Sequence, residues 1–229
     1  MEAFTLDSTE IIVLATAGGL FLIQIIYYLC LYNRIHARSR AVKQGDTHFT
    51  QELPPISVII CAREESENLR RNLGAVLEQD YPQGFDGYFV FDADNILAPN
   101  YVEAMNRTFS DGHDIVTSFR NSKNYADNWI SAGYALWFLR ESRYLNHARF
   151  LLGTSCAVSG TGFLFSRRVL EETGPWPFHL LTEDIQFSVD QVTRGRKIAF
   201  CPDAVLYDEQ PTTFRQSWNQ RLRWSKGYL

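Results

Sequence analysis

The segment Tyr88–Asn95, YFVFDADN, decides the fold. Its first half is an apolar, aromatic run that is typical of a buried strand, and two aspartates follow at once. Residues two apart in an extended chain point the same way, so Asp92 and Asp94 can converge on one hard cation. Such oxygen ligands favour Mg²⁺ or Mn²⁺, which keep open positions for diphosphate oxygens. Taken alone, the segment also fits a polar turn after a strand.

Apolar strands and amphipathic helices alternate along the chain around this segment. Ile56–Cys61, ISVIIC, is a continuous β-branched run suited to a strand buried on both faces. The other predicted strands are 115–119, 162–165, 197–201 and 205–207. The predicted helices are 66–79, 99–109, 129–146, 212–226 and one through Ile185, Val189 and Val192 that stops at Gly195. This alternation predicts an α/β sheet that is mostly parallel in its first half.

The N-terminal segment Ile11–Tyr32 is apolar apart from Thr16 and Gln24. As a helix it spans about 33 Å, which covers a bilayer core of about 30 Å. No basic residue precedes Arg34, which disfavours the main alternative, a cleaved signal peptide. Basic residues follow the segment, so its C-terminal side is expected in the cytoplasm.

These charges predict how the chain is organised. We expect a short non-cytoplasmic N-terminus over 1–10, one transmembrane helix over 11–32, a basic linker over 33–54 and a folded cytoplasmic domain over 55–229, held at the cell (plasma) membrane. The net charge of −4 lacks the basic excess of a nucleic-acid binder, so no nucleic-acid partner is expected. The four cysteines form no Cys-x-x-Cys pair and predict free thiols in a reducing compartment.

Two further clusters carry residues suited to chemistry. Thr182-Glu183-Asp184 opens a predicted helix, where a threonine cap and acids in the first turn are also ordinary. A positioned carboxylate there can take the proton of an attacking hydroxyl. Gln220, Arg223 and Trp224 share one helix face and offer an amide, a guanidinium for diphosphate and an indole for a sugar ring. The alternative is a surface helix with Phe214, Trp218 and Leu222 as its buried stripe.

In this order, and after the ISVIIC strand, the three clusters resemble family-2 glycosyltransferases. The resemblance is greatest to the membrane-bound group that includes cellulose, hyaluronan and poly-N-acetylglucosamine synthases, which carry Asp-x-Asp, Thr-Glu-Asp and Gln-x-x-Arg-Trp. It covers Pro55 to the C-terminus. It implies a GT-A fold and the inverting transfer of a sugar from a nucleotide-sugar, a UDP-sugar in that group, to a carbohydrate or lipid acceptor.

The resemblance also implies residue roles. Asp92 and Asp94 would hold the metal and the nucleotide diphosphate, and Asp184 would be the base, supported by Glu183. Cys61-Ala62-Arg63-Glu64-Glu65 is similar to the first nucleotide-binding loop, with Glu64 in place of the usual Asn. Ser159-Gly160-Thr161-Gly162 is similar to the acceptor-side segment, and a flexible turn before a strand is the alternative. The implied donor residues are thus Ala62, Glu65, Asp92, Asp94 and Arg223, and the implied acceptor residues are Gly160, Thr161, Gln220 and Trp224.

The chain departs from the family pattern in two places. The link from Tyr81 to Tyr88 leaves out at least one βαβ unit, roughly 30 residues or more, together with the acid that would read uracil. The sequence also stops five residues after Trp224, where the family continues into further membrane helices. Two other functions stay open: a catalytically silent membrane-anchored protein that binds a nucleotide or a partner, and a nucleotidyltransferase, which the lack of a Gly-rich activating loop disfavours.

Overall fold

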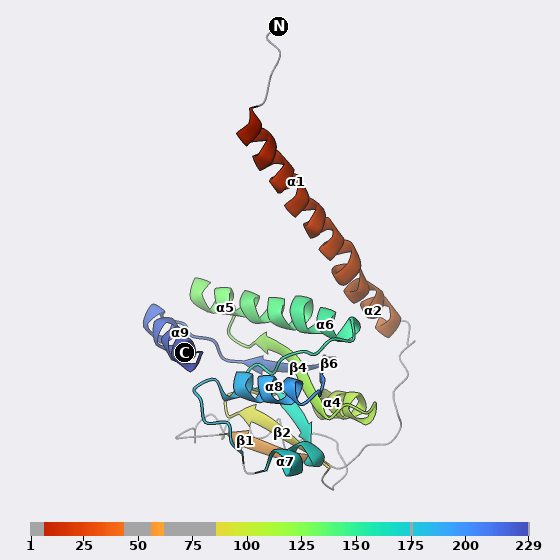
Figure 1. The fold of residues 1–229 in the computed structure, drawn as a ribbon. Helices are drawn as coiled ribbons and strands as arrows, with labels where there is room; N and C mark the ends of the chain where they lie inside the picture. The colour runs from red at the N-terminus through yellow and green to blue at the C-terminus, as the bar shows by residue number, and fades with distance from the viewer. Residues whose placement is uncertain (1–6, 44–55, 62–85, 175, 229) are drawn as a thin grey trace. The chain divides into compact units, whose positions relative to one another are not determined.

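The computed structural model describes residues 7–43, 56–61, 86–174 and 176–228 (Figure 1). The chain divides into two compact units, 1–47 and 48–229, and each is described by itself. The predicted helix at 66–79 and the nucleotide-loop residues Ala62 and Glu65 lie outside the described residues.

The first unit is one continuous helical rod. It comprises α1 (Ser8–Tyr27), a π-helical segment η1 (Tyr28–Tyr32) and α2 (Asn33–Lys43). Asp7 and Glu10 cap its start reciprocally, since each side chain accepts the other's backbone N–H at 2.8–2.9 Å. The linker predicted from residue 33 is helical as far as Lys43. Asn33–Lys43 contains no glycine or proline and several good helix formers, so the helix continues.

The segment Ser8–Arg38 is long and apolar enough to cross a membrane, by length and composition alone. None of its apolar window is buried, unlike the core helix of a soluble protein. A signal sequence near an N-terminus would pass the same test.

The second unit contains a six-stranded mixed sheet in the order β1-β2-β5-β4-β6-β3. Its strands are β1 (Ile56–Cys61), β2 (Gly87–Asp92), β3 (Ile96–Leu97), β4 (Ile115–Ser122), β5 (Phe163–Ser166) and β6 (Ile198–Asp208). β1, β2, β4 and β6 run in one direction, while β5 and β3 run against them. The expected α/β class is therefore confirmed, with a reversed strand in the middle of the sheet.

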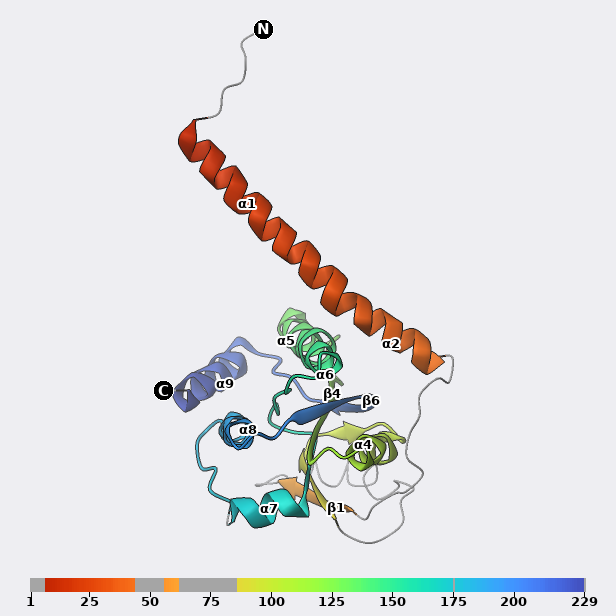
Figure 2. The ribbon, with the colours of Figure 1, turned by 45° about the vertical axis from the view of Figure 1, so that its right-hand side comes forward.

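Helices cover both faces of this sheet (Figure 2). Within the described residues they are α4 (Tyr101–Ser110), α5 (Trp129–Arg140), the π-helical segment η2 (Glu141–Asn146), α6 (His147–Leu151), α7 (Arg167–Thr173), α8 (Glu183–Thr193) and α9 (Phe214–Gly227). Phe89 and Phe91 of β2 pack with Tyr101 of α4 in one core. Phe163 and Phe165 of β5 join Phe187 of α8 in a second core. The alternation of side chains along each strand thus feeds two cores, one on each face.

Two helix and strand details differ from the sequence predictions. The expected strands 197–201 and 205–207 are one strand, β6, with an irregularity opposite Ser118 and Phe119 of β4. Pro202 lies at that irregularity and has no N–H for a sheet hydrogen bond, which explains the apparent break. On α8, Val189 and Val192 are exposed, while Phe187 and Gln191 are buried. The burial of the Phe187 ring, and not that of the valines, therefore sets which face of α8 points inward.

Candidate active site

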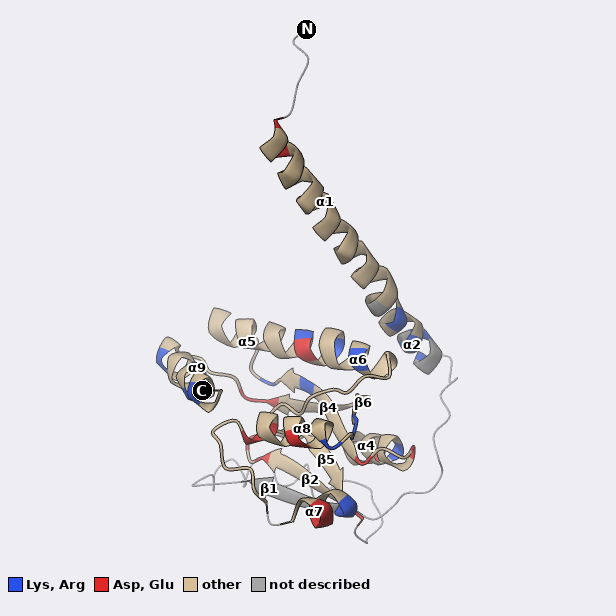
Figure 3. Ribbon diagram, viewed as in Figure 1, with Lys and Arg blue, Asp and Glu red and all other residues tan. Residues whose placement is uncertain are grey.

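The site forms at one edge of the sheet. Because β2, β4 and β6 are parallel, their carboxyl ends lie at this edge, together with the loop that enters the reversed strand β5. Asp92 ends β2, Arg120 lies near the end of β4, and Asp208 ends β6. Figure 3 shows acidic residues at the ends of β2 and β6 and at the start of α8. Ligands in open α/β sheets bind at such an edge.

The Asp-x-Asp turn is bonded to the glycine loop. The backbone N–H of Asp92 donates to Thr161 Oγ1 at 2.9 Å and to Asn95 Oδ1 at 3.2 Å. The Thr161 hydroxyl donates to Asn95 Oδ1, and Asn95 Nδ2 donates to Asp208 Oδ1 at 3.1 Å. The buried Asn95 and Thr161 therefore fix the backbone that carries both aspartates. This bonding makes the polar turn a structured part of the site.

Two glycines let the loop approach its neighbours. Gly162 has φ +70°, and a Cβ there would lie 1.9 Å from Leu206 Cδ2. Gly160 has φ +72°, and a Cβ there would lie 4.0 Å from Asp184 Oδ2. Both positions need glycine for their backbone conformation. The structure thus brings the predicted residues Gly160, Thr161 and Asp184 to one place.

The carboxylates of the Asp-x-Asp turn repel one another. Asp92 reaches solvent, but the surrounding protein removes part of its hydration, and Asp208 and Asp94 lie close. Lost hydration and then these two charges raise the pKa of Asp92 from 3.8 to about 7, against the lowering effect of Arg120. Desolvation and Asp208 likewise raise the pKa of Asp94 to about 6, although Lys123 lowers it.

These carboxylates fit a divalent cation. Among the described residues, no group of three or more His, Cys, Asp or Glu side chains could hold a metal ion. Two carboxylates that face a diphosphate are nevertheless a donor set for Mg²⁺ and Mn²⁺, which take their remaining ligands from substrate oxygens and water. After desolvation, the charge of neighbouring carboxylates raises both pKa values, and a cation would neutralise that charge.

The Thr-Glu-Asp cluster opens α8, as predicted. Thr182 occupies the cap position, but its hydroxyl makes no capping bond and donates instead to the Gly227 carbonyl of α9 at 3.0 Å. A Cβ at Gly227 would lie 2.6 Å from Thr182 Cγ2, so the two helices meet closely. Asp184 lies close to Glu141 and Tyr228. Desolvation raises the pKa of both groups, and the charge of Asp184 raises each further.

The Gln-x-x-Arg-Trp residues on α9 meet the site only in part. The Trp224 ring lies 6.1 Å from the Tyr134 ring of α5, and Arg223 is exposed. Gln220 Oε1 is buried and has no hydrogen-bond donor in the described part of the chain. No hydrogen bond, ion pair or ring contact among the described residues joins Arg223 or Trp224 to the aspartates. α9 reaches Asp184 through its C-terminal end instead.

The alternative packing of α9 is wrong. Phe214, Trp218 and Leu222 were its expected buried stripe, yet they are 67%, 60% and 43% exposed. α9 is held to α5 by polar contacts: Tyr134 Oη lies 3.1 Å from Ser217 Oγ, and Arg221 Nε donates to Tyr134 Oη at 3.3 Å.

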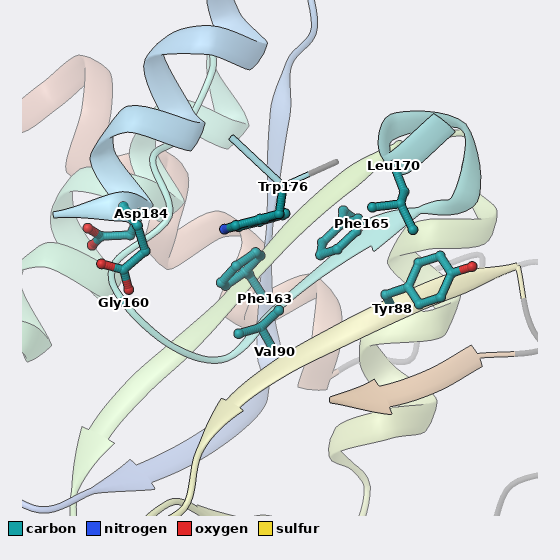
Figure 4. A pocket seen from close by; sticks show the side chains of 9 residues that line it. Tyr88, Val90, Gly160, Phe163, Phe165, Leu170, Trp176 and Asp184 are labelled. Atoms are coloured by element: carbon teal, nitrogen blue, oxygen red, sulfur yellow. The ribbon is translucent and has the colours of Figure 1, made fainter. Parts of the chain in front are cut away.

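A cavity of about 370 Å³ opens beside the catalytic candidates (Figure 4). Gly160, Glu183 and Asp184 lie at one end. Its other walls are apolar and come from Tyr88, Val90, Phe163, Phe165, Leu170 and Trp176. In Figure 4 the carboxylate of Asp184 lies beside Gly160, away from Tyr88 and Leu170.

Sequence reasoning missed three charged residues at this edge. Arg120 donates to Asp208 from Nε at 2.9 Å and from a terminal nitrogen. Glu141, on the π-helical segment, bonds Ser159, and desolvation raises its pKa. Arg120 and Asp208 directly follow predicted strands 115–119 and 205–207, so the rule that selected Asp92 also applies to them. Glu141 had no comparable signal, since it lies within a predicted helix.

The comparisons with known proteins agree with this geometry. The family model described as "Glycosyltransferase like family 2" matches residues 84–227. This chain belongs to glycosyltransferase family 2. The match covers the Asp-x-Asp turn, the glycine loop, α8 and all of α9.

Named relatives of the chain are glycosyltransferases. A "Probable glycosyltransferase YdaM" of Bacillus subtilis is 25% identical over 53% of this chain and 26% of its own length. A poly-β-1,6-N-acetyl-D-glucosamine synthase of Staphylococcus aureus is 31% identical over 36% of this chain and 20% of its own length. The aligned region is thus about a quarter or less of each relative.

The fold is also found in a solved structure. The mannosyltransferase PcManGT of Pyrobaculum calidifontis, in complex with GDP-Man and Mn²⁺, has a TM-score of 0.55 and 14% identity. The match covers 91% of this chain and 73% of that one. The expected GT-A fold is therefore confirmed.

Proposed function

We propose that this chain transfers a sugar from a UDP-sugar to an acceptor hydroxyl with inversion, as part of polysaccharide synthesis. One observation carries the proposal. The sheet edge brings Asp92, the glycine loop and Asp184 together, although they come from distant parts of the sequence. Membership of glycosyltransferase family 2 and the named synthase relatives support the reaction class.

Asp184 is the proposed general base. It removes the proton of the acceptor hydroxyl as that oxygen attacks the anomeric carbon, the C–O bond to the diphosphate breaks, and the nucleoside diphosphate departs with the bonding electrons. The attack and departure occur on opposite faces of the carbon, which inverts it. Gly160 has no side chain beside the Asp184 carboxylate, so an acceptor can approach there. Glu183 shares the first turn of α8 and supports the charge of the site.

Asp92 and Asp94 are the proposed holders of Mg²⁺ or Mn²⁺. When bound, such a cation supplies positive charge that stabilises the departing diphosphate. Thr161 and Asn95 fix the turn that presents the two carboxylates. Arg223 is proposed to contact the donor, with Gln220 and Trp224 on the acceptor side. Gln220 Oε1 supports that role, because a buried acceptor without a donor suits a ligand hydroxyl.

We further propose that Ser8–Arg38 anchors the chain in the cell membrane with the catalytic unit in the cytoplasm. The apolar helix and the basic residues after it support this orientation. Protease protection in sealed membrane vesicles tests it. The catalytic unit should be digested only from the cytoplasmic face, and digestion only from the opposite face would contradict the orientation.

The transfer itself is tested with the full chain in purified membranes. UDP release from a panel of UDP-sugars should require Mn²⁺ or Mg²⁺ and stop with a chelator. Asp94→Ala should abolish release, while Glu103→Ala, a change on α4, should leave it intact. Binding of UDP and Mn²⁺ by calorimetry without turnover of any donor would contradict the proposal and favour a catalytically silent nucleotide-binding relative.

A further inference from the structure

A buried ion pair lies at the centre of the catalytic edge. The side chains of Arg120 and Asp208 are only 14% and 4% exposed. Two guanidinium nitrogens of Arg120 donate to Asp208 Oδ2, which leaves Oδ1 to accept from Asn95. Gln210 Nε2 adds a bond to Oδ2 at 3.2 Å. Asp208 therefore holds Asn95, and Asn95 in turn bonds the backbone N–H of Asp92.

The same arginine also holds the glycine loop. Its third nitrogen donates to the Ser159 carbonyl at 3.0 Å, one residue before Gly160. The guanidinium carbon lies 3.8 Å from the centre of the Phe138 ring, and Ser142 Oγ accepts the Arg120 backbone N–H at 3.0 Å. These contacts fix the arginine on both sides. One side chain thus joins the Asp-x-Asp turn to the loop that borders Asp184.

Stability is a weak reason for this pair. Removing two charges from water costs about as much as their attraction returns, and apolar replacements of buried ion pairs are often neutral or stabilising. A positional reason fits better, because the pair is bonded both to Asn95 of the Asp-x-Asp turn and to the Ser159 carbonyl of the glycine loop.

We propose that Arg120 and Asp208 are positioning residues, which set the distance between the donor carboxylates and the acceptor-side loop. The proposal rests on the proposed function, since the two sides matter only if donor and acceptor meet between them. In this role the two residues act through the residues that they hold. Arg120 acts through Ser159 and Asp208 acts through Asn95, so both ends of the reaction depend on one ion pair.

The test separates position from stability. Arg120→Met with Asp208→Asn leaves no buried charge, and the new amide oxygen still accepts from Asn95. We expect this double variant to melt near the wild-type temperature, to bind UDP with Mn²⁺ at least tenfold more weakly, and to lose at least a hundredfold in kcat. A purely structural pair predicts wild-type binding and turnover once the fold is restored, and that result would overturn the proposal.

Arg120→Lys is the second variant, for the case in which the double variant fails to fold. It retains the positive charge at position 120. A lysine ammonium can reach Asp208 or the Ser159 carbonyl, but it does not reproduce the planar set of donors that lets the guanidinium bond both. The same losses in UDP binding and kcat are therefore expected. Wild-type binding and kcat in this variant would also refute the positioning role.

Arg196 and Glu172 provide the matched control. They form another ion pair with a well-buried arginine, 12% exposed, outside the catalytic edge. Arg196→Met with Glu172→Gln should leave UDP binding and kcat unchanged. If the wild-type chain itself fails to bind UDP with Mn²⁺, the proposed function and this proposal fall together. If the wild type binds and the double variant binds equally, only this proposal falls.

Discussion

In the proposed mechanism single carboxylates carry the chemistry, and the surroundings of each carboxylate differ. Asp92 and Asp94 share one turn, where desolvation and then the charge of Asp208 raise the pKa of both. Asp184 lies across the glycine loop, in the first turn of α8. Two acids suited to a cation and one suited to a proton therefore meet at one edge.

Asp184→Asn should abolish transfer and leave donor binding intact, because the amide keeps the shape of the side chain but accepts no proton. General-base loss costs about 10²–10⁴-fold in rate. UDP release and UDP calorimetry measure the two effects separately. Asp111→Asn, an exposed change after α4, is the control. Turnover within about threefold of the wild type would remove Asp184 as the base.

The pH dependence of metal binding should follow the raised pKa values. Because the folded protein holds the Asp92 proton more tightly than the unfolded chain, this group's stabilising contribution is present below 3.8 and is lost as the pH rises through about 7. Mn²⁺ replaces that proton. The gain in melting temperature from Mn²⁺ and UDP should therefore be larger at about pH 8 than at about pH 5.5.

Asp92→Asn is the control for this titration. In this variant the gain in melting temperature from Mn²⁺ and UDP should be nearly the same at both pH values, because the asparagine side chain does not titrate. Equal gains at both pH values in the wild type would show that these carboxylates do not bind the cation.

At the scale of single residues, the sequence predicted the acids but not their partners. Asp92 and Asp94 stood out because two acids followed an apolar strand at once. Arg120 and Asp208 each follow a predicted strand too, but their pairing depends on β4 and β6 being neighbours. That neighbourhood is a property of sheet order, which strand patterns alone do not contain.

Glycines set how closely the elements of the site approach. The loop into β5 passes between β2 and β4, where Gly162 N donates to the Val90 carbonyl at 2.9 Å and Ser118 N donates to the Gly162 carbonyl at 3.1 Å. α9 ends against the start of α8 at Gly227 and Thr182. At both places a glycine lies close to its neighbours, and an added side chain would separate the elements.

Gly162→Ala should destabilise the second unit by about 3–5 kcal/mol, from overpacking together with the cost of a positive φ. A Cβ there would lie 1.9 Å from Leu206 Cδ2 and 2.6 Å from Ser118 Oγ. Thermal melting of the detergent-solubilised chain measures the loss. Gly112→Ala is the control, because Gly112 also has a positive φ but no atom within 4 Å of an added Cβ. Equal losses in the two variants would contradict the close packing at Gly162.

Gly227→Ala should reduce the rate of transfer at least tenfold. The melting temperature should fall less than in Gly162→Ala, because α9 is mostly exposed and overpacking there costs about 1–3 kcal/mol. The new methyl would push α9 away from Thr182 and so from Asp184. UDP release measures the effect. Ser225→Ala, on the exposed part of α9, should be neutral. Full activity in Gly227→Ala would show that the contact between α8 and α9 is not needed.

At the scale of elements, periodicity predicted the helices and strands better than their faces. The helix through Ile185 was correctly placed, but Phe187 and not the valines points inward. α9 was also correctly placed, and its apolar stripe lies outside. A helical period identifies an apolar face, but the partner that covers a face is not local in sequence.

The whole chain combines an apolar N-terminal helix with a GT-A catalytic unit. The family match, the mixed sheet with its reversed β5 and the edge with the three acids all belong to the second unit. The described β1 pairs directly with β2 in parallel. The class of fold was predictable because its motifs are ordered along the chain, whereas the direction of β5 was not.

A structure of the full chain with UDP and Mn²⁺ tests the central claim most directly. We predict that the cation lies between Asp92, Asp94 and the diphosphate, on the same side of the sheet as Asp184. A nucleotide bound away from the carboxyl end of β2, with the aspartates untouched, would contradict the account.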